Sequence, residues 1–210
     1  LMNMPLEKLV EVEVLITGAS KYAEKASESP SIVEIITAED IKRYGYRSLA
    51  EALNGLHGIY SSSDRNYNTA GVRGFNMTGV SNSRILVMID GRRMNENVYD
   101  AAYLGEEFML DMGLIDHIEF IPGPGSSIYG ANAMMGVVNV VSKKGSDING
   151  TQVETGVGSF NTGLARTTYG KSFKNGANVL VSASGYISGG QEKLYYPEFN
   201  GPFTNNGVAE

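Results

Sequence analysis

Hydrophobic residues in the first part of the chain gather into short continuous runs. The clearest runs span residues 31–36, 85–89, 114–121 and 136–141, and they are rich in Val, Ile and Leu. Runs of this length and composition predict strands, and the run at 85–89 has the pattern of a buried strand. The dipeptide Asp90-Gly91 follows the second run and predicts a tight turn.

Two short helices are predicted after the first run. Thr37 and Asp40 have the spacing of a capping box, in which a hydroxyl and an acid three residues later bind each other's backbone N–H groups. Ser48 and Glu51 repeat this spacing. Gly45 is predicted to end the first helix, because glycine readily takes the left-handed conformation found after a helix C-terminus.

Two polar, turn-rich segments lie between the apolar runs, at residues 60–82 and 95–105. We expect both to be long loops. Long loops within a compact domain are usually functional or disordered.

The last part of the chain has a different pattern, with alternating polar and apolar residues at 152–158, 163–170 and 178–187. Asn/Gly turns separate these segments, as in an antiparallel meander. Alternation suits the wall of a membrane barrel, which has lipid on one side and a polar lumen on the other.

These patterns together predict an α+β fold. Residues 1–30 form a flexible leader, and 31–145 form a small mixed β-sheet with short helices. Residues 146–210 form a fragment of an antiparallel β-barrel, with about three strands. Three strands cannot close a barrel, and we therefore expect a truncated protein.

Composition narrows the class of protein. Of 210 residues, 42% are hydrophobic, which is enough for a packed core. The net charge is −6 and no basic stripe occurs, which argues against nucleic-acid binding. The absence of cysteine excludes disulfides and thiolate chemistry. No run reaches the roughly 18 apolar residues of a membrane-spanning helix, and the first ten residues lack a signal-peptide pattern.

Enzymatic chemistry is not predicted. His57 and His117 are the only histidines, and neither has the spacing of a metal ligand. The glycine-rich segment 123–136 matches neither phosphate-binding fingerprint. We therefore expect no catalytic site, no cofactor and no resident metal, and we assign the scattered methionines to core packing.

Four segments, in this order and spacing, resemble the plug domain of TonB-dependent outer-membrane receptors. The resemblance covers about residues 11–145. The segments are 35–41 (Ile-Ile-Thr-Ala-Glu-Asp-Ile), 72–75 (Val-Arg-Gly-Phe), 85–93 (Ile-Leu-Val-Met-Ile-Asp-Gly-Arg-Arg) and 118–140, which includes Gly-Pro-Gly-Ser-Ser-Ile-Tyr-Gly.

The resemblance implies a location and a set of partners. The plug would sit inside its own β-barrel in the bacterial outer membrane, with the leader in the periplasm. A TonB box in the leader would add as a strand to the periplasmic domain of TonB, which the inner-membrane ExbB/ExbD motor drives. The best match to a box is Glu13, Val14, Leu15, Ile16 and Thr17, and an ordinary edge strand or plain leader is the alternative.

The resemblance also implies that the two polar segments bind substrate. Tyrosines there offer flat apolar faces and polar tips, although solvated loop tyrosines are the plainer interpretation. The candidate residues are Tyr60, Asp64, Arg65, Asn66, Tyr67, Asn68, Asn97, Tyr99, Asp100 and Tyr103.

Arg73 and Arg84 are candidates for contacts between plug and barrel. Arg73 matches a plug arginine that pairs with acids on the inner barrel wall, and a solvent-exposed surface arginine is the plainer alternative. Pro122 departs from the family pattern, which more often has Arg or Lys before Gly-Pro. One locking charge is therefore absent, and Glu119 and Arg84 are the residues that would compensate.

The expected function is the plug, or gate, of a TonB-dependent active transporter. A ferric siderophore or a similar metal chelate is the expected cargo, because iron import is the commonest role of the family. The alternative is a ligand-binding or signalling module of the bacterial envelope without transport. About 22 barrel strands downstream would favour the transporter.

Overall fold

The computed structural model describes residues 15–16, 24–25, 32–65, 67–75 and 81–209. The chain divides into two compact units, Leu1–Ser142 and Lys143–Glu210. Within the described residues, no helix is both long enough and apolar enough to cross a membrane.

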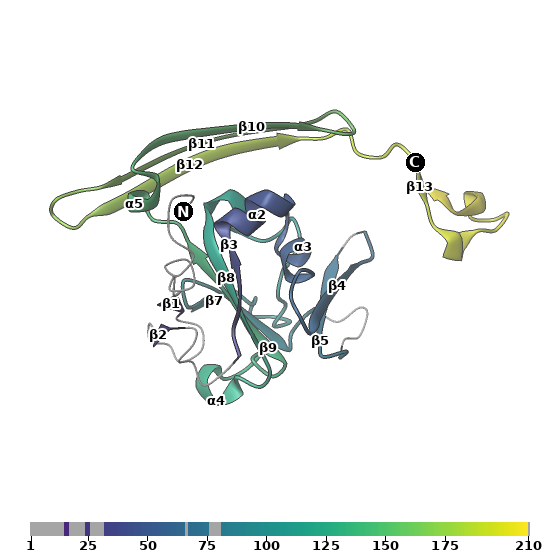
Figure 1. The fold of residues 1–210 in the computed structure, drawn as a ribbon. Helices are drawn as coiled ribbons and strands as arrows, with labels where there is room; N and C mark the ends of the chain where they lie inside the picture. Colours follow the sequence, from purple (N-terminus) through teal and green to yellow (C-terminus); the bar gives the residue numbers. More distant parts are fainter. Residues whose placement is uncertain (1–14, 17–23, 26–31, 66, 76–80, 210) are drawn as a thin grey trace, which may run out of the picture. The chain divides into compact units, whose positions relative to one another are not determined.

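The first unit is built on a five-stranded sheet with the order β3-β8-β9-β6-β7 (Figure 1). Strands β6 and β9 are parallel, and every other neighbouring pair is antiparallel, so the sheet is mixed. The four apolar runs were correctly predicted as strands. The strands are β3 (Glu34–Thr37), β6 (Ile85–Ile89), β7 (Arg92–Arg93), β8 (Ile115–Pro122) and β9 (Gly136–Ser142).

Helix α2 (Ala38–Tyr44) begins and ends as predicted. Thr37 and Asp40 form the reciprocal capping box, with N···O distances of 3.1 and 3.2 Å. Gly45 follows the helix in the left-handed conformation, with φ of 68°. These local signals are sufficient to set both helix ends.

Helix α3 (Leu49–Leu53) has only half of its predicted box. The hydroxyl of Ser48 accepts from the N–H of Glu51 at 3.3 Å. The carboxylate of Glu51 instead accepts from the N–H of Arg47 at 2.8 Å. Two further helical turns, η2 (Met112–Leu114) and α4 (Ser126–Tyr129), flank strand β8 in the chain.

Both faces of the sheet are buried, which explains why its strands are continuously apolar. Ile118, Phe120 and Val138 face the larger cluster, together with Leu49 and Leu53 of α3. The opposite face carries a smaller apolar cluster, comprising Leu86, Met88, Ile121, Ala133 and Val137.

The prediction of a long loop over residues 60–82 was wrong, because a β-hairpin occupies its first half. Strands β4 (Ile59–Ser63) and β5 (Asn68–Val72) pair antiparallel and lie beside α3 (Figure 1). Ile59, Ala70 and Val72 are buried, while most of the other side chains of the two strands are small and polar. This weak alternation explains why the hairpin resembles a loop in sequence.

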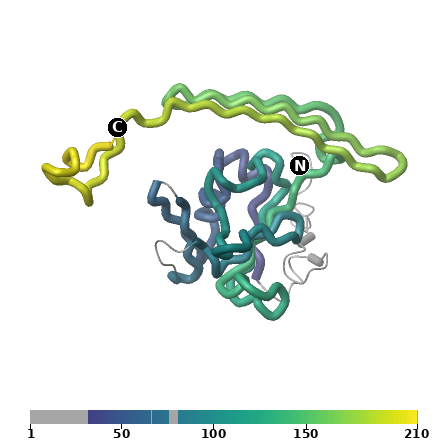
Figure 2. The backbone as a smooth tube through the Cα atoms, turned by 180° about the vertical axis from the view of Figure 1, so that it is seen from behind, coloured from purple at the N-terminus to yellow at the C-terminus, as the bar shows by residue number. Residues whose placement is uncertain are grey.

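The second unit confirms the three predicted meander strands. They form an extended, curved antiparallel ribbon in both views (Figure 1, Figure 2). The elements of this unit are α5 (Gly145–Ile148), β10 (Gly150–Gly158), β11 (Thr162–Ser172), β12 (Asn178–Ile187), β13 (Leu194–Tyr195), η3 (Pro197–Phe199), η4 (Asn205–Gly207) and β14 (Val208–Ala209).

The two faces of this ribbon differ in polarity. On one face, Glu154 pairs with Arg166 at 2.8 Å, and the hydroxyls of Thr168 and Ser182 lie 2.8 Å apart. The other face carries exposed apolar side chains, comprising Val153, Val157, Tyr169, Val181 and Ile187.

Only part of the predicted TonB box can be placed. Strand β1 (Leu15–Ile16) pairs antiparallel with β2 (Glu24–Lys25). Glu13, Val14 and Thr17 lie outside the described residues.

Candidate functional site

The two segments predicted to bind substrate are joined by one buried side chain, that of Asn82. Its Nδ2 donates to the carbonyl oxygens of Asn68 and Ala102, both at 2.9 Å. Its Oδ1 accepts from the N–H of Ala70 at 2.8 Å. Hairpin β4–β5 and the 95–103 loop therefore lie side by side.

Helix α3 bonds to the hairpin and to the residue that follows the 95–103 loop. The N–H of Ala50 donates to the carbonyl of Leu104 at 2.8 Å, and the carbonyl of Ala50 accepts from the hydroxyl of Ser61 at 3.0 Å. The amide of Asn68 occupies the space where a Cβ on Gly105 would lie. A larger residue at 105 would therefore displace Asn68.

Glu96 gives the 95–103 loop its shape. Its carboxylate accepts from the N–H groups of Val98, at 2.8 Å, and of Tyr99, and more weakly from that of Ala101 at 3.5 Å. The bond from Val98, and then those from Tyr99 and Ala101, lower the pKa of Glu96 because they stabilise the charged form.

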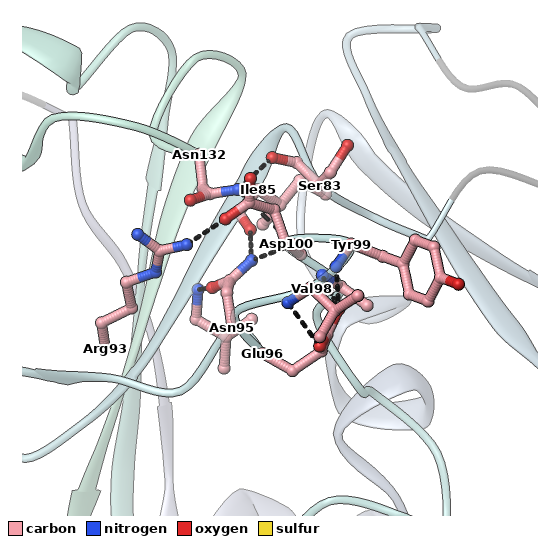
Figure 3. A network of polar contacts seen from close by, with 11 residues as sticks. Ser83, Ile85, Arg93, Asn95, Glu96, Val98, Tyr99, Asp100 and Asn132 are labelled. Carbon is pink, nitrogen blue, oxygen red and sulfur yellow. Dashed lines mark hydrogen bonds and ion pairs between the residues drawn. The ribbon is translucent and has the colours of Figure 1, made fainter.

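Asp100 is held on both its backbone and its side chain (Figure 3). Its carbonyl oxygen accepts from Nδ2 of Asn95 at 3.0 Å and from Nδ2 of Asn132 at 3.4 Å. Its carboxylate pairs with the guanidinium of Arg93. Asp100, a predicted substrate-binding residue, is thus also paired with Arg93 at the surface.

Asn95 fixes the start of the loop to strand β6. Its Oδ1 accepts from the N–H of Val87 at 2.9 Å, and its Nδ2 donates to the carbonyl of Ile85 at 3.0 Å. Asn132 also donates to the carbonyl of Ser83 at 2.6 Å. The side chains that hold the loop therefore come from three separate parts of the chain, at Asn82, at Asn95 and Glu96, and at Asn132.

The four predicted tyrosines all reach solvent. Tyr99 is 76% exposed and Tyr67 is 65% exposed, whereas Tyr60 and Tyr103 are 41% and 43% exposed. Two tyrosines come from the hairpin and two from the loop that Asn82 ties to it. The site is thus a surface with several accessible aromatic rings.

The other predicted site residues are placed less uniformly. Arg65 and Asn97 are exposed, Asn68 is half-buried beneath the surface, and Asn66 lies outside the described residues. Asp64 closes the hairpin turn, because its Oδ1 accepts from the N–H of Tyr67 at 2.6 Å. Asn68 and Asp64 thus have structural contacts of their own.

Sequence reasoning missed the residues that build this surface, namely Asn82, Asn95, Glu96 and Asn132. The sequence offers only the residue type as a hint, because asparagine tolerates the left-handed conformation better than most residues. Asn82 and Asn132 adopt this conformation, with φ of 55° and 72°.

Arg73 lies at the tip of a two-residue turn. Arg73 and Gly74 have φ of 52° and 81°, the positive values of a type I′ turn, and Val72 and Phe75 bond across it. The Arg73 guanidinium is exposed and lies 3.5 Å from the carbonyl oxygen of Pro122. Arg84 is also exposed.

Glu119 cannot supply the charge that is missing at Pro122, because it is fully buried and already bonded. One carboxylate oxygen accepts from Nδ2 of Asn139 at 2.8 Å, and the other lies 3.2 Å from Nε2 of His117. Nδ1 of the same histidine lies 2.7 Å from the carboxylate of Asp116. Among the described residues, no three His, Asp or Glu side chains cluster as a metal site requires.

This histidine is held between two carboxylates. Burial alone would lower the pKa of His117, but the hydrogen bonds to Glu119 and Asp116 outweigh burial and raise it. Carboxylate oxygens only accept, so the protonated ring donates to both. The contacts of His117 are therefore those of a structural residue of the sheet.

A sequence profile of the TonB-dependent receptor plug domain matches residues 25–137, more than half of the 210-residue chain. The chain belongs to this family. The resemblance inferred from the four segments is confirmed, although the leader before residue 25 lies outside the match.

Curated relatives of this chain include vitamin B12 transporters. The vitamin B12 transporter BtuB of Vibrio cholerae serotype O1 is 31% identical over 147 residues, which cover 70% of this chain and 23% of that protein. BtuB of Vibrio vulnificus is 29% identical over 178 residues, covering 83% and 28%. The chain spans about a quarter of the length of these relatives.

Solved receptors confirm the fold of the plug chain. FpvA of Pseudomonas aeruginosa, bound to a heterologous ferric pyoverdine, has a TM-score of 0.66 at 18% identity over 83% of this chain and 22% of its own. The ferric-catecholate import receptor Fiu of E. coli K12 has a TM-score of 0.61 at 21% identity, covering 84% and 23%. The likeness agrees with the predicted fold class, which is a small mixed sheet with short helices followed by antiparallel strands.

Proposed function

We propose that this chain is the plug of a TonB-dependent transporter in the bacterial outer membrane, where it occludes a surrounding β-barrel and opens during uptake. The observation that carries this proposal is the family match over residues 25–137. The ribbon β10–β12 supports it, because one polar and one apolar face suit a barrel wall between lumen and lipid.

The domain organisation follows from the same proposal. Residues 1–30 are the leader, 31–145 the plug, and 146–210 the first strands of the barrel. The division of the chain into compact units at Ser142 and Lys143 supports the second boundary.

Energy coupling is assigned to residues 13–17. The segment would add as a strand to the periplasmic domain of TonB, and the ExbB/ExbD motor would supply the force. The extended conformation of Leu15–Ile16, which pairs with Glu24–Lys25, supports a segment able to form strand hydrogen bonds.

The cargo is assigned by class, as a bulky organic metal complex such as a ferric siderophore or cobalamin. The exposed rings of Tyr60, Tyr67, Tyr99 and Tyr103 support this class, because flat aromatic faces pack against large rigid ligands and their hydroxyls bond to polar groups. The relatives named for vitamin B12 and for ferric siderophores support both members of the class.

Arg73 and Arg84 are proposed to meet acids on the inner wall of the barrel. The exposed position of Arg73 at the tip of a tight turn supports this role. Arg73→Ala should loosen the plug inside the intact receptor, measured as faster hydrogen exchange of residues 72–75, whereas Arg73→Lys should retain part of the contact.

The decisive experiment uses the intact receptor and a variant without residues 13–17, with an equal deletion of residues 1–5 as control. Calorimetry with the periplasmic domain of TonB and uptake of labelled ligand are measured on all three proteins. We expect the 13–17 deletion alone to lose TonB binding and uptake while ligand still binds. A receptor that binds ligand but never TonB would instead be an envelope binding or signalling module.

A further inference from the structure

The side chain of Asn82 meets both halves of the proposed ligand surface. It is 7% exposed, and its amide uses both donors and its acceptor on backbone groups of hairpin β4–β5 and the 95–103 loop. Its own carbonyl accepts from the N–H of Ile85 at 3.1 Å, which fixes Asn82 to the start of β6.

We propose that Asn82 is a positioning residue that locks hairpin β4–β5 and the 95–103 loop into one preformed ligand-binding surface. A ligand that touches either segment then meets both in a fixed arrangement. This inference rests on the proposed function, because it assumes that these two segments bind the cargo.

The chemistry requires an asparagine at this position. Two carbonyl oxygens, of Asn68 and Ala102, need donors, while the N–H of Ala70 needs an acceptor. A carboxamide supplies two donors and one acceptor from a single short side chain, whereas a carboxylate supplies only acceptors. The left-handed φ of 55° at Asn82 also favours asparagine over glutamine.

A separate anchor holds each segment, so the loss of Asn82 should not unfold them. Ala50 of helix α3 already binds Leu104, just after the loop, and Ser61 in the hairpin. Each segment is thus attached to the fold independently of Asn82. What Asn82 adds is the bond between them.

Asn95 provides a matched control. It is 5% exposed, and its amide also has two donor bonds and one acceptor bond. All of its bonds lie within strand β6 and the 95–103 loop, and none reaches the hairpin. Asn95→Asp should therefore disturb the loop and its attachment to β6 but leave the hairpin unchanged, whereas Asn82→Asp should disturb both the hairpin and the loop.

The test measures hydrogen exchange in the intact receptor without ligand. In Asn82→Asp we expect exchange about tenfold faster in residues 60–72 and in residues 95–103, because buried carbonyls lose their donors. In Asn95→Asp we expect faster exchange in residues 95–103, with exchange in residues 60–72 unchanged. Exchange in β8 and β9 should stay unchanged in both variants, which shows that the sheet is folded.

Asn82→Ala is the second variant, because it removes the three bonds without burying a charge. If Asn82→Asp unfolds the sheet, Asn82→Ala is used as the test instead. We expect the same faster exchange in residues 60–72 and 95–103. Wild-type exchange of the hairpin in a folded Asn82 variant would overturn the proposal.

A ligand arm separates this inference from the proposed function. Cyanocobalamin and a panel of ferric siderophores are titrated against the same proteins. No binding by the wild type would count against the proposed function, while the exchange data still decide whether Asn82 couples the segments. With a binding ligand, we expect Asn82→Asp to lower affinity about tenfold, mainly through slower association, since the competent arrangement is less populated. Unchanged affinity in a loosened variant would overturn the proposal.

Discussion

Ser142 donates both its backbone N–H and its hydroxyl to the carboxylate of Asp90, at 2.8 and 2.7 Å. Asp90 in turn donates its N–H to the carbonyl of Val140 at 2.9 Å. The turn between β6 and β7 is therefore hydrogen-bonded to the end of β9, at the last residue of the first unit.

Replacing this aspartate should weaken the end of the sheet. Asp90→Ala removes both acceptors and places alanine at a left-handed φ of 50°, so we expect the free energy of unfolding to fall by about 1–3 kcal/mol. Asp90→Asn keeps one acceptor and tolerates this conformation, so it should lose less. Urea unfolding of the first unit measures the loss of stability in both variants. Equal stability of the wild type and the two variants would contradict a stabilising role for the bonds between Asp90 and Ser142.

The stability of the first unit should depend on pH through His117. Its pKa is raised, because the hydrogen bonds to Glu119 and Asp116 outweigh the opposing effect of burial. A raised folded-state pKa gives stabilisation that is complete below the ordinary value of about 6.5 and is lost as pH rises through the raised value. His117 should therefore add more to the free energy of unfolding at pH 6 than at pH 8, which unfolding curves at the two pH values measure.

His117→Gln should remove much of this difference. An NMR titration that finds the pKa of His117 at or below its ordinary value would contradict the charged bridge to Glu119.

Glu96 should control the order of the 95–103 loop. Because bonds from backbone N–H groups, led by that of Val98, lower its pKa, the loop should stay ordered above the ordinary glutamate pKa and loosen as pH falls through the lowered value. Glu96→Gln should loosen the loop at neutral pH. Exchange of the Val98 and Tyr99 amides measures this, and the nearby exposed change Asn97→Ala should leave both amides protected.

Residues 1–145 should fold without the rest of the chain. Their sheet, helices and both apolar clusters lie within the first compact unit, Leu1–Ser142. Circular dichroism and a dispersed NMR spectrum of this fragment test the plug boundary. A disordered fragment would show that folding of the plug requires residues beyond 145.

The sheet could be predicted because its strands are buried on both faces. In Ile85–Ile89 and Gly136–Ser142 almost every side chain contributes to burial, so the pattern stands out without knowledge of the partners. The helix caps at Thr37 and Gly45 are similarly local. Signals of this kind depend only on neighbouring residues.

The hairpin and the residues that fix the candidate site could not be predicted in the same way. Strands β4 and β5 gain their bonds to helix α3 and to Asn82 only in the folded protein. The roles of Asn95 and Asn132 likewise depend on which carbonyl groups the fold brings near them. The sequence analysis expected the tyrosines in long loops, whereas Tyr60 lies in strand β4, and the framework that presents the tyrosines was not predicted.

Strand β9 is the last strand of the first unit in the chain, yet it lies in the sheet between β8 and β6. Until Gly136–Ser142 has been synthesised, β6 and β8 have no strand to join them, and their apolar edges stay open. Pairing between segments so distant in sequence makes folding slow. A growing chain that ends before β9 therefore exposes unpaired apolar strand edges, which favour aggregation.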